Sequence, residues 1–225
     1  NGVESNVGEI RAKIEQARPD LKVASVKPSV APGMYEVQLQ AGPVLYATAD
    51  GDFFILGDLF AVNMDGLTNL SELQRDLERK ELIASVKPDD MIIFSPEGDV
   101  KSVVTVFTDV DCFYCQKLHQ EVPAMNKAGI EVRYLAYPRA GVGSDAYRKI
   151  ASAWCSENPQ QAITLLKNRH PIPENVCPGN PVADQFMLGQ KAGVRGTPAL
   201  VMESGAIHPG YLSADELAAR LGLQQ

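Results

Sequence analysis

The first third of the chain changes from helical to alternating spacing of its apolar residues. Residues 5–18 carry apolar side chains at helical intervals and are followed by Pro19, which predicts an amphipathic helix that ends there. Beyond Pro19 the apolar period becomes two, and Pro-Gly, Gly-Pro and Asp-Gly pairs separate the runs. This alternation predicts short strands at residues 21–26, 34–39, 44–48 and 53–56. Asp50-Gly51, between the last two, is typical of a hairpin turn.

These strands form a unit that is small for independent folding. A unit of about 60 residues buries only a marginal core. Its outer strands would also leave unpaired backbone groups at the edges of the sheet. Pairing with a second copy of the chain would remove both problems, so we expect a homodimer formed through this N-terminal region.

A strongly charged helix is predicted at residues 68–85, before Pro88. Its leucines at positions 70, 73 and 77 make only a narrow apolar stripe. Such a polar helix is typical of a solvated bridge between domains, and the alternative is an ordinary surface helix of one domain.

The remainder of the chain alternates strands and helices. Strands are predicted at 103–107, 130–135 and 199–202, and a helix at 116–122. Residues 144–192 are mostly helical in pattern, with several prolines interrupting them. Ser213 and Glu216 form a capping box that predicts a final helix.

Composition narrows the class of protein. The net charge of −7 among 225 residues argues against binding to nucleic acid or to an anionic membrane surface. No apolar run approaches the roughly 18 residues of a membrane-spanning helix. The N-terminus lacks a methionine and a hydrophobic segment, so we expect a mature end from which a signal peptide has been removed. The even number of cysteines, 4, suits an oxidising compartment.

Cys112 and Cys115 stand where a predicted strand gives way to a predicted helix. The first sulfur of such a C-x-x-C pair lies at the helix N-terminus, where unpaired N–H groups and the helix dipole stabilise a thiolate. The second sulfur lies one turn inside the helix. This placement predicts a redox-active dithiol in which Cys112 attacks and Cys115 resolves.

A zinc site is the alternative for this pair, because Cys115 and His119 share a helical face. The other cysteines, Cys155 and Cys177, are not a second C-x-x-C, so we expect redox chemistry and no metal or other cofactor. We expect His119 to be a half-exposed helix residue. Two roles are left open for Asp109: it is either a solvated loop carboxylate or a group that influences the proton of Cys115.

Gly196-Thr197-Pro198 precedes the predicted strand 199–202. A C-x-x-C helix followed much later by Thr-Pro before a strand is the thioredoxin-like arrangement, in which the proline is cis and lies against the sulfurs. A trans proline at the start of a strand is the alternative. We expect Pro198 to be cis, and Thr197 and Pro198 to offer backbone groups to an extended client segment.

Three motifs together resemble the DsbC/DsbG family of bacterial periplasmic disulfide isomerases, and the resemblance extends over essentially the whole chain. They are Phe107-Thr108-Asp109-x-x-Cys112-x-Tyr114-Cys115-x-Lys117-Leu118-His119, Val132-Arg133-Tyr134-Leu135-Ala136-Tyr137-Pro138-Arg139 and Gly196-Thr197-Pro198.

The resemblance implies an α+β fold in three parts. Residues 1–65 would form a cystatin-like dimerisation domain, 66–88 a linker helix, and 89–225 a thioredoxin-like catalytic domain with a helical insertion. The family implies a V-shaped homodimer whose two catalytic domains face each other across a cleft. It also implies that Cys155 and Cys177 form a structural disulfide, separate from the redox-active Cys112–Cys115 disulfide.

The implied activity is isomerisation and reduction of wrong disulfides in misfolded periplasmic clients, combined with chaperone activity. The membrane thiol reductase DsbD would supply electrons. A holdase-like chaperone of the DsbG type and a net dithiol oxidase are the alternatives. Phe113 departs from the family, which commonly has glycine there, so the reduction potential does not carry over; with Tyr114, Phe113 would shape the site and contact clients.

Overall fold

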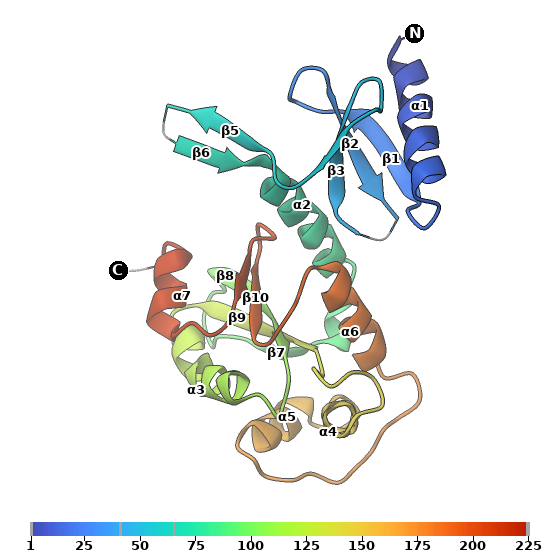
Figure 1. Cartoon of the computed structure of the whole chain (residues 1–225). Coiled ribbons are helices and arrows are strands. Elements are labelled where there is room, and N and C mark those ends of the chain that lie inside the picture. The colour runs from blue at the N-terminus through green and yellow to red at the C-terminus, as the bar shows by residue number, and fades with distance from the viewer. Residues whose placement is uncertain (1, 41, 65, 224–225) are drawn as a thin grey trace. The chain divides into compact units, whose positions relative to one another are not determined.

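The computed structural model describes residues 2–40, 42–64 and 66–223 (Figure 1). The chain divides into two compact units, Asn1–Leu73 and Gln74–Gln225. The prediction of a separate linker between two domains is not decided by this division and stays a prediction. Within the described residues, no helix is sufficiently long and apolar to cross a membrane.

The first unit packs one helix on an antiparallel sheet. Helix α1 (Gly2–Ala17) lies against a sheet in the order β1-β2-β3-β4. Ile10 and Ile14 of the helix are buried together with Val37 and Leu45 of the sheet, so the predicted helical and alternating patterns meet in one core. The strands are β1 (Val23–Pro28), β2 (Met34–Leu39), β3 (Val44–Thr48) and β4 (Phe54–Leu56).

The predicted hairpin at Asp50-Gly51 joins β3 to β4, and Gly51 has the positive φ of 70° that such a turn requires. A second hairpin was not predicted. Strands β5 (Phe60–Asn63) and β6 (Gly66–Asn69) pair with each other alone, and the charged helix begins only after them. That helix, α2 (Leu70–Ala84), therefore starts two residues later than predicted.

The second unit contains a sheet in the order β11-β10-β8-β9-β7. Only the central pair, β8 (Ser102–Thr108) and β9 (Ile130–Ala136), is parallel. The outer strands are antiparallel to their neighbours: β10 (Ala199–Met202), β11 (Ile207–Pro209) and β7 (Ile92–Phe94), which follows the short 3₁₀ turn Pro88–Asp90. Strands β7 and β11 were not predicted.

Alternate residues of the central strands bury opposite faces of this sheet. Val104 and Val106 of β8 face a core that also contains Leu118 of α3 (Phe113–Lys127) and Leu217 of α7 (Ala214–Arg220). Phe107 belongs to the other face, where residues of α6 (Val182–Lys191) and the end of α2 pack. Both faces are covered, as a parallel strand pair requires.

An insertion between β9 and α6 contains α4 (Asp145–Trp154) and α5 (Pro159–Lys167) (Figure 1). The two helices bury Ile150 and Ile163 in the core that also contains α3. Helix α3 continues past its predicted end at 122, through Pro123. The proline removes one backbone donor, but Val122 and Met125 on either side of it are buried, and this packing holds the helix together.

Candidate active site

The C-x-x-C pair lies at the start of α3, directly after the turn that leaves β8. Cys112 is the N-cap residue, and its Sγ accepts a hydrogen bond from the backbone N–H of Cys115 at 3.3 Å. Both cysteines are free thiols in this structure, which is the reduced form of the predicted redox pair. The exposed fraction is 3% for Cys112 and 0% for Cys115, so Cys112 is the sulfur nearer to solvent.

The loop before β10 closes over the sulfurs. The Thr197–Pro198 peptide bond is cis. Cys112 Sγ lies 3.2 Å from the carbonyl oxygen of Thr197, to which the protonated thiol donates, so the loop contacts the sulfur through backbone. The buried Thr197 hydroxyl has no hydrogen-bond partner among the described residues, and its dipole near the sulfurs lowers the pKa of both cysteines.

The surroundings separate the acidities of the two thiols. A hydrogen bond from the Cys115 thiol lowers the pKa of Cys112 most, and burial opposes it; the Thr197 hydroxyl, the backbone N–H of Cys115 and the charge of Arg139 lower it further, to about 5. Burial raises the pKa of Cys115 well above that of an ordinary thiol. The geometry therefore supports Cys112 as thiolate and Cys115 as protonated thiol at neutral pH.

Asp109 is a buried carboxylate in the turn between β8 and α3. Its exposed fraction is 2%, so the alternative of a solvated loop residue is wrong. Its Oδ2 accepts the backbone N–H of Arg139 at 2.9 Å and Nε of the same residue at 3.1 Å. Its Oδ1 accepts the N–H of Asp111 at 2.9 Å. These bonds hold the turn and bring the Arg139 charge near Cys112.

Aromatic residues surround the dithiol on the outside. Phe113 and Tyr114, between the cysteines, are 61% and 56% exposed and contact each other edge to face with ring centroids 5.4 Å apart. Tyr211 lies beside Tyr114, and Lys117 Nζ lies 4.3 Å from the Tyr211 ring centroid. A groove of about 410 Å³ runs along the cis-proline loop; its lining includes Thr197, Pro198, Ile207 and Pro209. The exposed aromatic rings and this groove therefore place apolar surface beside the dithiol turn and along the cis-proline loop.

Cys155 and Cys177 are joined by a disulfide with an S–S distance of 2.01 Å. Cys155 caps the C-terminus of α4, and Cys177 lies in the proline-containing segment before α6. The bond therefore ties this segment to the helical insertion and takes no part in the C-x-x-C geometry.

His119 is buried, with an exposed fraction of 7%, so the expectation of a half-exposed residue is wrong. Its Nε2 lies 2.9 Å from Thr164 Oγ1, which itself donates to the Gln160 carbonyl at 2.7 Å. Thr164 therefore accepts from His119 Nε2–H, and the Tyr134 hydroxyl donates to Nδ1 at 3.0 Å. Burial and the Lys167 charge lower the pKa of His119 to about 4, so the ring is neutral.

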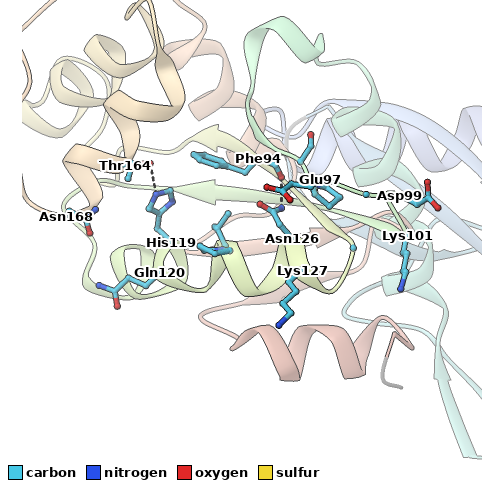
Figure 2. A pocket seen from close by; sticks show the side chains of 16 residues that line it. Phe94, Glu97, Asp99, Lys101, His119, Gln120, Asn126, Lys127, Thr164 and Asn168 are labelled. Atoms are coloured by element: carbon cyan, nitrogen blue, oxygen red, sulfur yellow. Dashed lines mark hydrogen bonds between the residues drawn. The ribbon is translucent and has the colours of Figure 1, made fainter.

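His119 and Thr164 also line a groove of about 930 Å³ beside α3, which Figure 2 shows from close by. Neither cysteine of the C-x-x-C pair lines it. Asn126, which also lines this groove, donates from its side-chain Nδ2 to the carbonyl oxygens of Phe94 and Ile130, each at 2.9 Å. In the described part of the chain, no group of three His, Cys, Asp or Glu residues is arranged to hold a metal ion.

We expect His119 to make stability depend on pH. The unfolded chain binds a proton on this histidine below pH 6.5, whereas the folded protein does so only near pH 4, so stability falls as pH drops through that window. Urea denaturation should show about 2 kcal/mol less stability at pH 5 than at pH 7 from this residue. His119→Gln should remove this part of the pH dependence of unfolding. The control His170→Gln changes an exposed histidine and should show the same pH dependence as wild type. Equal pH dependence of both variants would contradict this assignment.

A dithiol at a helix N-terminus, beside a cis-proline and on a sheet of this order, defines a thioredoxin-like thiol–disulfide protein. The family model described as a thioredoxin-like domain matches residues 88–225. The one described as the disulfide bond isomerase protein N-terminal domain matches residues 3–72. The predicted α+β architecture, with these two kinds of domain, is confirmed.

Curated relatives match nearly the whole chain. The thiol:disulfide interchange protein DsbC of Escherichia coli K12 is 35% identical over 208 residues, which cover 92% of this chain and 85% of the relative. DsbC of Salmonella typhimurium is 36% identical over 220 residues, 95% and 88% of the two chains. The crystal structure of a disulfide interchange protein from Neisseria gonorrhoeae is similar with 31% identity and a TM-score of 0.54, covering 62% of this chain and 100% of that one. The chain belongs to the DsbC family of thiol:disulfide interchange proteins.

Proposed function

We propose that the protein is a thiol:disulfide interchange enzyme that rearranges non-native disulfide bonds in client proteins of the periplasm. The observation that carries the proposal is the Cys112 thiol, which has a pKa of about 5 at the N-cap of α3 beside cis-Pro198. Membership of the DsbC family supports the same activity and a periplasmic location. The Cys155–Cys177 disulfide suits the oxidising conditions there.

In the first half of the reaction, the Cys112 thiolate attacks one sulfur of a client disulfide. A Cys112–client bond forms, and the second client sulfur leaves as a thiolate. Thr197 and Pro198 present backbone groups to the extended client, and Phe113 and Tyr114 contact its apolar side chains.

The mixed disulfide then has two fates. In isomerisation, another client thiolate attacks the client sulfur of the adduct and releases Cys112 unchanged. In reduction, Cys115 attacks Cys112, forms the Cys112–Cys115 disulfide and leaves a reduced client. The second route consumes the enzyme's dithiol, so the protein needs an electron donor, for which we propose the membrane thiol reductase DsbD.

Reactivation of scrambled ribonuclease in a glutathione buffer tests this function. The reduced protein should restore ribonuclease activity at substoichiometric amounts. The redox state of Cys112 and Cys115 in the periplasm separates an isomerase, reduced at rest, from a net oxidase, oxidised at rest. A protein that suppresses aggregation without reactivating ribonuclease would instead be a holdase, the function that the exposed Phe113 and Tyr114 also support.

The N-terminal unit supports a homodimer, in agreement with the family model that matches it. Apolar side chains of strands β4, β5 and β6 are exposed in the single chain: Phe54 54%, Ile55 58%, Leu56 64%, Phe60 49%, Val62 84% and Leu67 69%. Strand β4 is also the free edge of its sheet. A second copy of this unit would cover the apolar surface and pair the edge.

We expect Val62→Asp to convert the dimer to a monomer, because it places a charge in this apolar surface. Sedimentation velocity measures the change. Loss of the dimer should lower isomerase activity, whereas the rate of Cys112 alkylation should be unchanged. Val30→Asp is the matched control, since Val30 is 73% exposed in the turn between β1 and β2, outside the apolar surface. A dimeric Val62→Asp variant would exclude this surface as the interface.

A further inference from the structure

Lys167 is a buried lysine that is hydrogen-bonded to the segment leading from β8 into the dithiol. It is the last residue of α5, and its side chain has an exposed fraction of 2%. Its Nζ donates to the Thr108 hydroxyl and to the carbonyl oxygen of Asp109, the latter at 3.0 Å. Both acceptors are uncharged; Thr108 ends β8, and Asp109 begins the turn that leads into Cys112.

No carboxylate among the described residues forms an ion pair with Lys167. Asp109, the buried acid nearby, is already engaged by the Arg139 guanidinium. Asp111 pairs with Lys149 at 2.9 Å on the surface. Burial lowers the pKa of Lys167, and the charges of the cysteines, Asp109 and Asp111 oppose that effect, so the ammonium form is maintained by the dithiol site around it. Such isolated buried groups cluster at functional sites.

The charges around the dithiol leave a single positive charge in excess. Lys167 and Arg139 are the cations, and the carboxylate of Asp109 neutralises one of them. The negative charge of one thiolate neutralises the remaining positive charge. In the free reduced enzyme that thiolate is Cys112; once Cys112 is bonded to a client, its sulfur is neutral and the positive charge becomes available to Cys115.

We propose that Lys167 is a positioning residue for the second half-reaction, where its buried ammonium stabilises the Cys115 thiolate that resolves the mixed disulfide. The inference rests on the proposed thiol–disulfide interchange. Burial raises the pKa of Cys115, so this thiol ionises poorly unless a cation opposes the effect. The Lys167 charge lowers the pKa of Cys115, as does the backbone N–H of Asp109.

Lys167 interacts with titratable groups on every side. Cys115 and His119 belong to α3 and Cys112 is its N-cap, whereas Asp109 and Asp111 belong to the preceding turn. From β9, the Tyr134 ring has its centroid 5.7 Å from Lys167 Nζ. Among these groups the cysteines are the ones that change charge during the reaction. When Cys112 enters the mixed disulfide its negative charge is lost, and the Lys167 charge then acts on Cys115 without that competing thiolate.

The resolving step balances as follows. Cys115 loses its proton, and its thiolate attacks Cys112 Sγ. The Cys112–Cys115 bond forms as the Cys112–client bond breaks. The electron pair of the broken bond leaves on the client sulfur, which takes up the proton. Over both half-reactions, two electrons pass from the enzyme dithiol to the client disulfide.

Lys167→Met tests the proposal, because it keeps the length of the side chain and removes the charge. Reduced protein is mixed with oxidised glutathione, acid-quenched at intervals and analysed by mass spectrometry, which separates formation of the Cys112–glutathione adduct from its resolution. Resolution should be slower by about tenfold or more at pH 7, as expected when a neighbouring charge is removed. Adduct formation should change less than resolution.

The pH profile distinguishes this role from a merely structural one. The resolution rate of Lys167→Met should keep rising with pH through the range in which the wild-type rate has levelled off, because more Cys115 is ionised there. Lys191→Met, an exposed lysine on α6, should behave as wild type. Lys167→Gln is a second charge-removing variant that retains a donor for Thr108 and Asp109, and it carries the test if the methionine variant does not fold.

Two outcomes overturn the inference: wild-type resolution rates in the charge-removing variants, or equal slowing of both half-reactions. Either result leaves the proposed function standing as long as the wild-type protein forms and resolves the glutathione adduct. If the wild-type protein forms no adduct at Cys112, the proposed function itself fails.

Discussion

Cys112→Ala abolishes reactivation of scrambled ribonuclease, with a loss of about a hundredfold or more, because the attacking sulfur is removed and no other group replaces it. Cys115 cannot substitute, since it is completely buried and burial raises its pKa. The measurement is the recovery of ribonuclease activity in a glutathione buffer, with the variant and wild type at equal concentration.

Cys115→Ala is the matched control, because it removes the same atoms one helical turn further in. It should still attack the client and should accumulate the Cys112–client adduct, which non-reducing electrophoresis detects. Suppression of aggregation by Cys112→Ala should remain, since Phe113 and Tyr114 are unchanged. Substantial reactivation by Cys112→Ala would exclude Cys112 as the nucleophile.

Removal of the second disulfide by Cys155→Ala with Cys177→Ala lowers the free energy of unfolding. The bond closes a loop with a sequence separation of 22. In the chain-entropy account, its loss costs about 3 kcal/mol. Urea denaturation of wild type and double variant at pH 7 measures the difference.

The C-x-x-C pair provides the control for that experiment. The double variant should retain the wild-type rate of Cys112 alkylation at low denaturant, because the disulfide makes no contact with the dithiol turn. Under mild reductant, mass spectrometry should show Cys155–Cys177 intact when Cys112–Cys115 is reduced. If the two pairs are reduced together, the separation into a redox pair and a structural pair is wrong.

Local sequence patterns predicted the strands that are bounded by glycine and proline turns. The bounds of β2, β3 and β10 are those expected from alternating residues between glycine and proline turns. Strands β7 and β11, of three residues each, were missed because so short a run shows no periodicity. They are strands only because a neighbouring strand supplies their hydrogen bonds, and that information is tertiary.

The same limit applies to the site. The Cys112–Cys115 motif and Thr197-Pro198 each have a sequence signature, and the structure brings them together. Lys167 has no such signature: it follows Ile163 and Leu166 at the end of an apolar helix, where a lysine ordinarily reaches solvent. Its burial, and that of Asp109 beside Arg139, follows from packing between segments distant in sequence.

The pH dependence of alkylation tests the central claim, that Cys112 is a thiolate nucleophile at the N-cap of α3. The reduced protein is treated with iodoacetamide at a series of pH values, and the labelled cysteine is mapped by mass spectrometry. The account predicts label on Cys112, at a rate that stays high down to a midpoint near pH 5. Preferential labelling of Cys115, or a Cys112 midpoint near the value of about 8.5 of an ordinary thiol, would contradict it.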